Sequence, residues 1–210
     1  MESLPGPLFF LPGWGFDQRV LSLLPGAAED ALPWQALSSF CRPELGDMVI
    51  EAIKAAGEPH HLVGWSMGAN LALDLASRQP ELVRSLTLVG LRRCWPKPEV
   101  AAIGRGLKAD MAAFMTDFYR KCFLGNRPAY TKFIRRLEDD YLADLDLPLL
   151  LAGLDYLAGF TLPVLPPGLP VRLVHGRKDV IAPLAELPSL PGAKVTVVAG
   201  AGHFPFTLEF

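Results

Sequence analysis

Apolar runs of strand length alternate with amphipathic stretches at both ends of this chain. Most of these runs are apolar at consecutive positions, which is typical of strands covered on both faces in a parallel sheet. The sequence therefore predicts an α/β architecture with a mainly parallel sheet of about six strands. The predicted strands are Pro7–Leu11, Pro33–Ser38 (a weak pattern), His60–Trp65, Val83–Leu91, Pro170–Gly176 and Ala193–Gly200.

Helical spacing and stop residues predict three helices between these strands. The first covers Asp17–Leu24, begins at a residue type that favours the N-cap, and is ended by Pro25–Gly26. The second covers Glu44–Gly57, with its terminal glycine as the stop. The third covers Met67–Pro80 and follows a predicted strand directly.

Residues 92–162 interrupt the alternation. This segment reads as one helix after another and contains no strand candidate. We expect a helical lid inserted after the fourth strand, so that the core comprises residues 1–91 and 163–210 and the lid comprises residues 92–162.

A Gly-x-Ser-x-Gly sequence, Gly64 to Gly68, lies between a predicted strand and a predicted helix. A strand that turns abruptly into a helix leaves room only for minimal side chains two positions before and after the turn residue. The Ser66 hydroxyl then projects from the carboxyl end of the sheet, beside the positive end of the helix dipole. This context predicts that Ser66 is a nucleophile. The alternative is a serine that only caps the helix and is flanked by glycines by chance, since it would produce the same sequence pattern.

A serine nucleophile needs a base and an acid that orients the base, in the chain order Ser, Asp or Glu, His for this arrangement. His60 and His61 precede the serine strand, and His175 ends a strand, where it is expected to support a loop. His203 follows the last strand in a glycine-rich loop that can bring its imidazole over the serine. We therefore predict His203 as the base.

The acid is expected in the loop after the strand that precedes the histidine loop. Asp179 occupies this loop, and Pro183 is expected to open a helix after it. A plain turn or cap role for Asp179 is the alternative, and Asp155 in the helical segment is the second candidate for the acid.

A tetrahedral intermediate also requires two N–H donors for its oxyanion. We predict the backbone N–H of Met67, directly after the nucleophile, as one donor. The glycine-rich loop after the first strand supplies the other, for which Trp14 is the expected residue, although Gly13 and Gly15 also fit plain turn positions.

Composition excludes several other classes of protein. The formal net charge of −2 argues against a dedicated nucleic-acid binder. Three widely spaced cysteines indicate free thiols in a reducing compartment, and no metal-ligand spacing is present. The sequence contains no apolar run long enough to predict a membrane span, and it does not begin with a basic leader. A cytoplasmic location is therefore expected. No cofactor is expected either.

Several motifs together resemble the α/β-hydrolases, and more narrowly the pimeloyl-acyl-carrier-protein methyl ester esterases of biotin synthesis. The similar pieces are "PGWGFD", "GWSMGANLALDLA", "VRLVHGRKDVIAP", "GAGHFPF" and "GLDYLAGFTLPV". The resemblance places the nucleophile, acid and base on Ser66, Asp179 and His203. It places the oxyanion donors on the backbones of Trp14 and Met67.

The chain departs from the pattern of that family in two places. The family commonly has His-Gly before the tryptophan, whereas this chain has Pro12–Gly13, so packing beneath the oxyanion loop is expected to differ. The family also has a closing helix after the base, and here the sequence ends seven residues after His203. Either the chain is shortened here, or another element or a second subunit is expected to cover the sheet face that such a helix covers.

The predicted lid is strongly basic in its first part. Between Arg92 and Arg136, eleven basic residues stand against three acidic ones. A solvated helical face explains such a run, and a docking surface for an acidic partner explains it equally well. The resemblance implies acyl carrier protein as that partner. The expected docking residues are Arg120, Lys121, Arg135 and Arg136.

Aromatic residues recur in the same segment at spacings of three to five residues. The simplest interpretation is that these aromatic side chains form the underside of the lid and pack against the sheet. By analogy with the family, part of this surface lines an apolar channel for an acyl chain. The expected channel residues are Trp14, Trp65, Phe114 and Phe118.

The sequence thus predicts a serine carboxylesterase, and the resemblance implies the methyl ester of pimeloyl-acyl carrier protein as its substrate. A generalist carboxylesterase or thioesterase for small acyl esters is the enzymatic alternative. A non-catalytic receptor with a hydrolase fold is the alternative outside enzymes.

Overall fold

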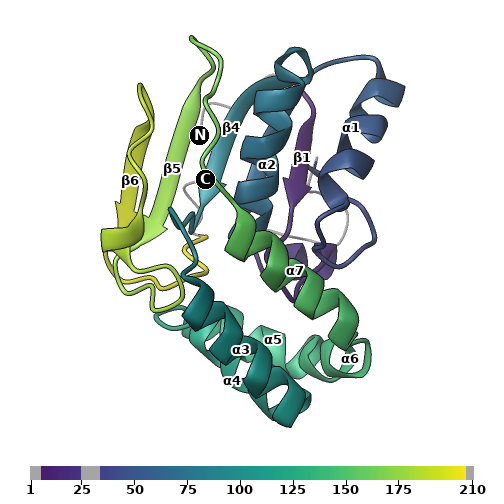
Figure 1. Ribbon diagram of the computed structural model, residues 1–210, viewed down its shortest axis with the longest axis vertical. Helices are drawn as coiled ribbons and strands as arrows, with labels where there is room; N and C mark the ends of the chain where they lie inside the picture. Colours follow the sequence, from purple (N-terminus) through teal and green to yellow (C-terminus); the bar gives the residue numbers. More distant parts are fainter. Residues whose placement is uncertain (1–5, 25–33, 207–210) are drawn as a thin grey trace.

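A computed structural model describes residues 6–24 and 34–206, and Figure 1 shows the arrangement of its elements. Six strands, all parallel, form one sheet in the order β2-β1-β3-β4-β5-β6. Their bounds are β1 Leu8–Leu11, β2 Trp34–Gln35, β3 His60–Trp65, β4 Val83–Val89, β5 Val171–Gly176 and β6 Lys194–Val198. The predicted parallel α/β sheet is therefore confirmed.

The central strand β3 is buried along its whole length. It pairs with β1 on one side, where Leu11 lies opposite Gly64, and with β4 on the other, where Trp65 lies opposite Val89. Since all strands are parallel, their carboxyl ends meet at one edge of the sheet. That edge is where ligands bind in open α/β sheets.

Two helices cover this part of the sheet, as the helical spacing predicts. Helix α1 spans Leu45–Ala56 and ends at Gly57, whose φ of 76° is left-handed and favours glycine. Helix α2 spans Met67–Arg78 and follows β3 after a single residue, Ser66. The two helices pack side by side, and α2 also packs on β3 and β4 (Figure 1).

Five further helices lie between β4 and β5, and we refer to them together as the helical block. Figure 1 shows the block across the carboxyl ends of the strands. The helices are α3 Lys97–Ala109, α4 Met111–Cys122, α5 Arg127–Arg136, α6 Glu138–Ala143 and α7 Leu147–Gly159. Neither these nor the other helices in the described residues have the length and apolar composition that a membrane span requires.

Side-chain caps explain why the helical block divides into short helices. Asp110 accepts a hydrogen bond from the N–H of Ala113 and starts α4. Asn126 and Asp146 cap α5 and α7 in the same way. Each cap satisfies an N–H group that the helix itself leaves without an acceptor.

Three predicted elements are shorter than expected. The helix predicted over Asp17–Leu24 is a 3₁₀ helix, Gln18–Leu23, because its two buried residues, Val20 and Leu23, are three positions apart. The predicted strand Pro33–Ser38 is reduced to β2. The helix expected after Pro183 is a three-residue 3₁₀ turn, Leu184–Glu186. The stop at Pro25–Gly26, the start at Pro33 and the end of the chain after Phe206 lie outside the described residues.

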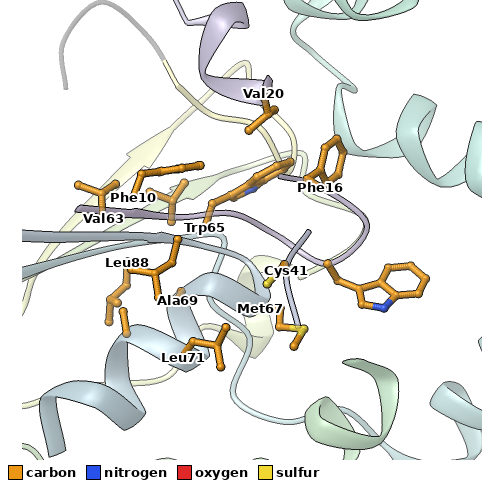
Figure 2. Packing of buried hydrophobic residues seen from close by; sticks show 14 of the residues in the cluster. Phe10, Phe16, Val20, Cys41, Val63, Trp65, Met67, Ala69, Leu71 and Leu88 are labelled. Carbon is orange, nitrogen blue, oxygen red and sulfur yellow. The ribbon is translucent and has the colours of Figure 1, made fainter. Parts of the chain in front are cut away.

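An aromatic cluster joins the sheet to the helical block. Figure 2 shows Phe16 and Trp65 side by side, with ring centroids 4.6 Å apart. The Phe16 ring also contacts the rings of Tyr119 and Tyr141 in the helical block, at 5.0 and 5.7 Å. Phe16 is fully buried, so the loop after β1 is held between the two regions of the molecule.

Candidate active site

Ser66 occupies the sharp turn between β3 and α2. Its φ of 55° and ψ of −121° lie in a region that L-residues rarely adopt, and it is the single non-glycine residue with positive φ in the described part of the chain. Such a conformation costs about 1–3 kcal/mol and persists only where the surroundings enforce it. The turn exposes Ser66 to a cavity at the carboxyl edge of the sheet.

Two glycines make this turn possible. A Cβ atom on Gly64 would collide with the Gly68 carbonyl oxygen and the Ala69 backbone. A Cβ atom on Gly68 would collide with the carbonyl oxygens of Leu11, the last residue of β1, and of Pro12, the residue after it. Close backbone approach on both sides therefore explains the Gly-x-Ser-x-Gly sequence.

Asp179 and His203 meet in a direct hydrogen bond, from His203 Nδ1 to Asp179 Oδ2 at 2.7 Å. Both side chains are almost completely buried. The other carboxylate oxygen, Oδ1, accepts the N–H groups of Ile181 and Ala182 at 2.9 and 2.8 Å. Because an ionised carboxylate only accepts, Nδ1 of His203 carries the proton and Nε2 presents its lone pair.

The surroundings of Asp179 keep it ionised. Burial raises the pKa of this carboxyl group, but the electrostatic interaction with His203, the hydrogen bond from its ring and the N–H of Ala182 outweigh burial. The pKa of Asp179 therefore lies below its ordinary value. The carboxylate is suited to orienting an imidazole and to balancing a positive charge that forms on it.

The backbone of Val89 and Gly90 contacts both Ser66 and His203. The N–H of Ser66 donates to the Val89 carbonyl at 2.8 Å, and the next residue, Gly90, packs directly against the His203 ring. The indole N–H of Trp65 donates to the His203 carbonyl at 2.7 Å. Nε2 of His203 is buried and has no hydrogen-bond partner among the described residues. In enzymes with a serine nucleophile, the hydrogen bond between the serine hydroxyl and this nitrogen often forms only when substrate binds.

The two expected oxyanion residues lie near Ser66: Met67 follows it directly, and Trp14 lines the same cavity. Met67 is the first residue of α2, so its N–H has no acceptor within the helix. The backbone of Trp14 forms an isolated bridge with Cys41. The indole N–H of Trp14 donates to the Leu150 carbonyl of α7 at 2.9 Å, which anchors the loop to the helical block.

The other histidines have structural partners elsewhere. His60 and His61 lie at the amino end of β3, where they contact the Glu58 carbonyl and the Ser85 hydroxyl. His175 is buried at the end of β5, and its Nε2 donates to the Ala182 carbonyl at 2.6 Å. That bond fixes the loop that carries Asp179, as expected for a loop-supporting residue. Asp155, the second candidate for the acid, is exposed on α7 and does not reach His203.

Ser66 opens into a largely apolar cavity of about 240 Å³. Trp14, Phe114 and Phe118 line this cavity, as the sequence predicts. Sequence reasoning missed several lining residues because they lie on separate elements that only folding brings together. These are Trp95, Glu99, Ile103, Asp117, Lys121, Leu154, Leu157, Val180 and Ile181.

Trp65 does not line the cavity. Its side chain has no exposed surface and packs against Phe16, Phe204 and His203 beneath the serine turn. The prediction that Trp65 contacts an acyl chain is therefore corrected. Because strand residues alternate between faces, the tryptophan before the serine points into the core when the serine points out.

The expected docking cations fall into two groups. Arg120 and Lys121 both pair with Asp117, at 2.6 and 2.7 Å, and these contacts lower the pKa of the Asp117 carboxyl group. Arg135 and Arg136 are exposed at the end of α5 and form no ion pair within the described residues. One carboxylate offsets only one of the two cations, so the first group keeps one net positive charge, whereas Arg135 and Arg136 present two.

A second groove lies between α3 and α7. Its floor is apolar and includes Leu154, which also lines the cavity at Ser66. Lys97, Arg105 and Lys108 line it without ion pairs in the part of the chain that the structure describes, and Asp155 is its acidic residue. Within the described residues, no group of three or more His, Cys, Asp or Glu side chains is arranged to hold a metal ion.

Comparison with known sequences places the chain among hydrolases. Residues 8–208 match the alpha/beta hydrolase family. The chain is 32% identical to a pimeloyl-(acyl-carrier protein) methyl ester esterase from Aeromonas hydrophila, over 93% of this chain and 76% of that protein. It is 30% identical to a protein of the same name from Aromatoleum aromaticum, over 95% of this chain and 91% of that protein.

Solved structures share the fold at lower sequence identity. An esterase from Exiguobacterium antarcticum has a TM-score of 0.79 at 17% identity, and covers 94% of this chain and 84% of its own. A bromoperoxidase from Bacillus anthracis has a TM-score of 0.74 at 14% identity, with 95% and 86% covered. Since esterases and a bromoperoxidase share this architecture, the likeness shows the fold alone.

Proposed function

The chain belongs to the alpha/beta hydrolase family, and we propose that it is a serine carboxylesterase with Ser66 as nucleophile, His203 as base and Asp179 as acid. One observation carries the proposal. The 2.7 Å bond to Asp179 leaves Nε2 of a buried imidazole without a partner among the described residues, and the Val89–Gly90 backbone contacts both this ring and Ser66, which is held at a φ of 55°. That is the arrangement in which a neutral imidazole takes a hydroxyl proton.

The reaction then follows from the positions of these groups. Nε2 of His203 takes the Ser66 proton while the Ser66 oxygen attacks the ester carbonyl, and Asp179 balances the imidazolium charge. The N–H groups of Met67 and Trp14 are proposed to stabilise the oxyanion, a contribution of roughly 3 kcal/mol per donor. His203 returns the proton to the leaving alcohol. Water, activated by the same imidazole, then releases the acid and frees Ser66.

The proposed substrate is the methyl ester of pimeloyl-acyl carrier protein, in biotin biosynthesis. The names of the two relatives support it, as does the apolar cavity, in which Trp14, Phe114 and Phe118 are proposed to contact a straight acyl chain. The helical block is proposed to act as the lid. An acidic carrier protein is proposed to dock on it through Arg135 and Arg136, with Arg120 and Lys121 at the border of the same surface.

A generalist esterase remains the second candidate, and one observation favours it. Asp117 pairs with both Arg120 and Lys121 and reduces the net charge of this group from +2 to +1, which weakens the basic surface next to the cavity. An enzyme for small free esters needs no docking surface. A receptor without catalysis is a third possibility that the same experiment addresses.

The test is a turnover panel with carrier-linked and free methyl esters of dicarboxylic acids. A carrier-specific esterase has a much higher kcat/KM for the linked ester than for the free one. Equal values for both indicate the generalist, and no turnover of any ester by folded protein contradicts the esterase.

Charge reversal then locates the docking surface. Arg135→Glu with Arg136→Glu is expected to reduce turnover of the carrier-linked ester and to leave a small chromogenic ester unaffected. Arg105→Glu with Lys108→Glu, in the groove between α3 and α7, is the matched pair of substitutions. A loss on the linked ester only in this second pair would move the docking surface to that groove.

A further inference from the structure

A partly buried ion pair holds the segment that joins β4 to the helical block. Arg92 is 8% exposed, and its guanidinium donates to both carboxylate oxygens of Glu99, at 2.7 and 2.8 Å. The same guanidinium stacks over the Trp95 ring, 4.5 Å from the ring centroid. A bidentate pair and a stacking contact together define the position of both partners closely.

Both partners of Arg92 line the cavity that contains Ser66. Trp95 lies just before α3, and Glu99 lies in the first turn of α3, four residues before a third lining residue, Ile103. These three residues form one wall of the cavity. The N-terminus of α3 has no side-chain cap, since its N-cap residue is Pro96, so the pair with Arg92 is a principal restraint on this first turn.

The segment that leads to this wall also contacts the base. Gly90, which packs against the His203 ring, is only two residues before Arg92. The next residue, Arg93, points the other way. It is exposed, its N–H donates to the Glu186 carbonyl, and its guanidinium lies 4.0 Å from the Glu186 carboxylate. Arg92 and Arg93 therefore form a natural pair for comparison, one facing the cavity wall and one facing solvent.

We propose that Arg92 is a positioning residue that fixes the wall formed by Trp95, Glu99 and Ile103 and thereby determines which acyl groups the cavity accepts. The proposal rests on the esterase function, because the cavity is the acyl site only if Ser66 is the nucleophile. Arg92 touches neither Ser66 nor His203 in any contact that the structure describes. Its effect is therefore expected on acyl-chain binding more than on the chemical step.

Loss of the guanidinium releases both partners. Glu99 is 41% exposed and can turn to water, and the Trp95 indole loses the planar group that it stacks on. A lysine in place of Arg92 keeps one charge, but it provides neither the bidentate geometry nor a planar face. Arg92→Lys is therefore expected to behave like Arg92→Met rather than like the wild type.

The experiment measures kcat and KM for p-nitrophenyl esters of increasing acyl length. The variants are Arg92→Met, Arg92→Lys and Trp95→Leu, with Arg93→Met as the matched control. In both Arg92 variants and in Trp95→Leu, we expect KM for the longer esters to rise roughly tenfold, as for the loss of one apolar contact in a pocket. The kcat should change much less than KM. The double variant of Arg92→Met and Trp95→Leu should be no worse than either single variant, because both remove the same wall.

Three results would overturn the proposal: equal loss on all acyl lengths with a lower Tm, a KM profile identical to that of Arg93→Met, or full additivity of the double variant. A binding measurement separates this proposal from the proposed function. Calorimetry with methyl octanoate and Ser66→Ala protein should show weaker binding when Arg92→Met is added. If the wild type hydrolyses no ester but this binding difference is present, the esterase proposal fails and the wall proposal stands. If binding is unchanged, the wall proposal fails.

Discussion

The edge of the sheet and the helical block hold their polar side chains in different ways. At the edge, Asp179 is fixed by two backbone N–H groups and Ser66 by a turn whose flanking glycines leave no room for side chains. In the helical block, Asp117 is paired with Arg120 and Lys121 one helical turn away, and all three side chains are about half exposed. The first region depends on main-chain geometry, and the second on contacts between side chains.

This difference indicates which properties of the protein can change easily. Groups held by backbone contacts in a buried site are pre-organised for one reaction, and moving them disrupts the fold. Groups held by exposed side-chain pairs contribute little stability and can be exchanged. We therefore expect the sheet edge to fix the chemistry, and the helical block to tune the substrate.

The largest expected effect separates two aspartates, one in each region. Asp179→Asn should reduce kcat for a methyl ester by about 10⁴-fold, because the amide stabilises the wrong tautomer of His203. Asp155→Asn, on the exposed face of α7, should leave kcat within twofold of the wild type, because this exposed side chain does not contact Asp179 or His203. Steady-state kinetics on both variants checks this. Comparable activity of the two variants would contradict the proposal that Asp179 is the acid that orients His203.

The next effect concerns two glycines and protein stability. Gly68→Ala places a methyl group against the carbonyl oxygens of Leu11 and Pro12, and is expected to cost several kcal/mol of unfolding free energy. Gly104→Ala in α3 meets only the Leu151 methyl group, at 3.6 Å, and should stabilise the helix by about 0.5–1 kcal/mol. Urea unfolding of both variants gives the comparison. A stable Gly68→Ala protein would mean that the serine turn is less constrained than the structure indicates.

The smallest effect concerns the pH dependence of stability. Burial lowers the pKa of His175 below its ordinary value of 6.5, and the contacts to the Ala182 carbonyl and to Asp179 only partly oppose this. Since the unfolded chain binds this proton at a higher pH than the folded one, His175 makes stability fall as the pH drops below 6.5. His175→Gln should therefore show a shallower loss of Tm than the wild type between pH 6.5 and pH 5. Parallel Tm profiles for the two proteins would contradict this role.

Much of the sheet edge could be predicted from the sequence, because strong local signals mark it. Consecutive apolar residues predict buried strands, and the glycine spacing around Ser66 reflects a close backbone approach that no other residue permits. The structure brings Asp179 to His203 as the order of elements predicts. The 3₁₀ turns were not predictable in type, since they depend on which residues the tertiary structure buries.

The helical block was predictable as a set of helices but not in its contacts. The count of basic residues did not use spacing: Asp117 lies three and four residues before Arg120 and Lys121 in one helix, where such side chains meet. The pair of Arg92 with Glu99 could not be predicted, because Arg92 precedes α3 and the contact depends on how the connecting segment folds. The prediction that Trp65 lines the cavity was wrong because the Gly-x-Ser-x-Gly motif does not specify which face of the strand the tryptophan occupies. Side-chain contacts between elements are the part that the sequence alone leaves open.

The most direct measurement of the central claim is intact-protein and peptide mass spectrometry during hydrolysis of a slow ester, with the hydrolysis rate of the Ser66→Ala variant measured in parallel. The account predicts an acyl adduct on the peptide that contains Ser66, and a fall in kcat of about 10⁴-fold or more in Ser66→Ala. An adduct on another residue, or hydrolysis at the wild-type rate without the Ser66 hydroxyl, would contradict it.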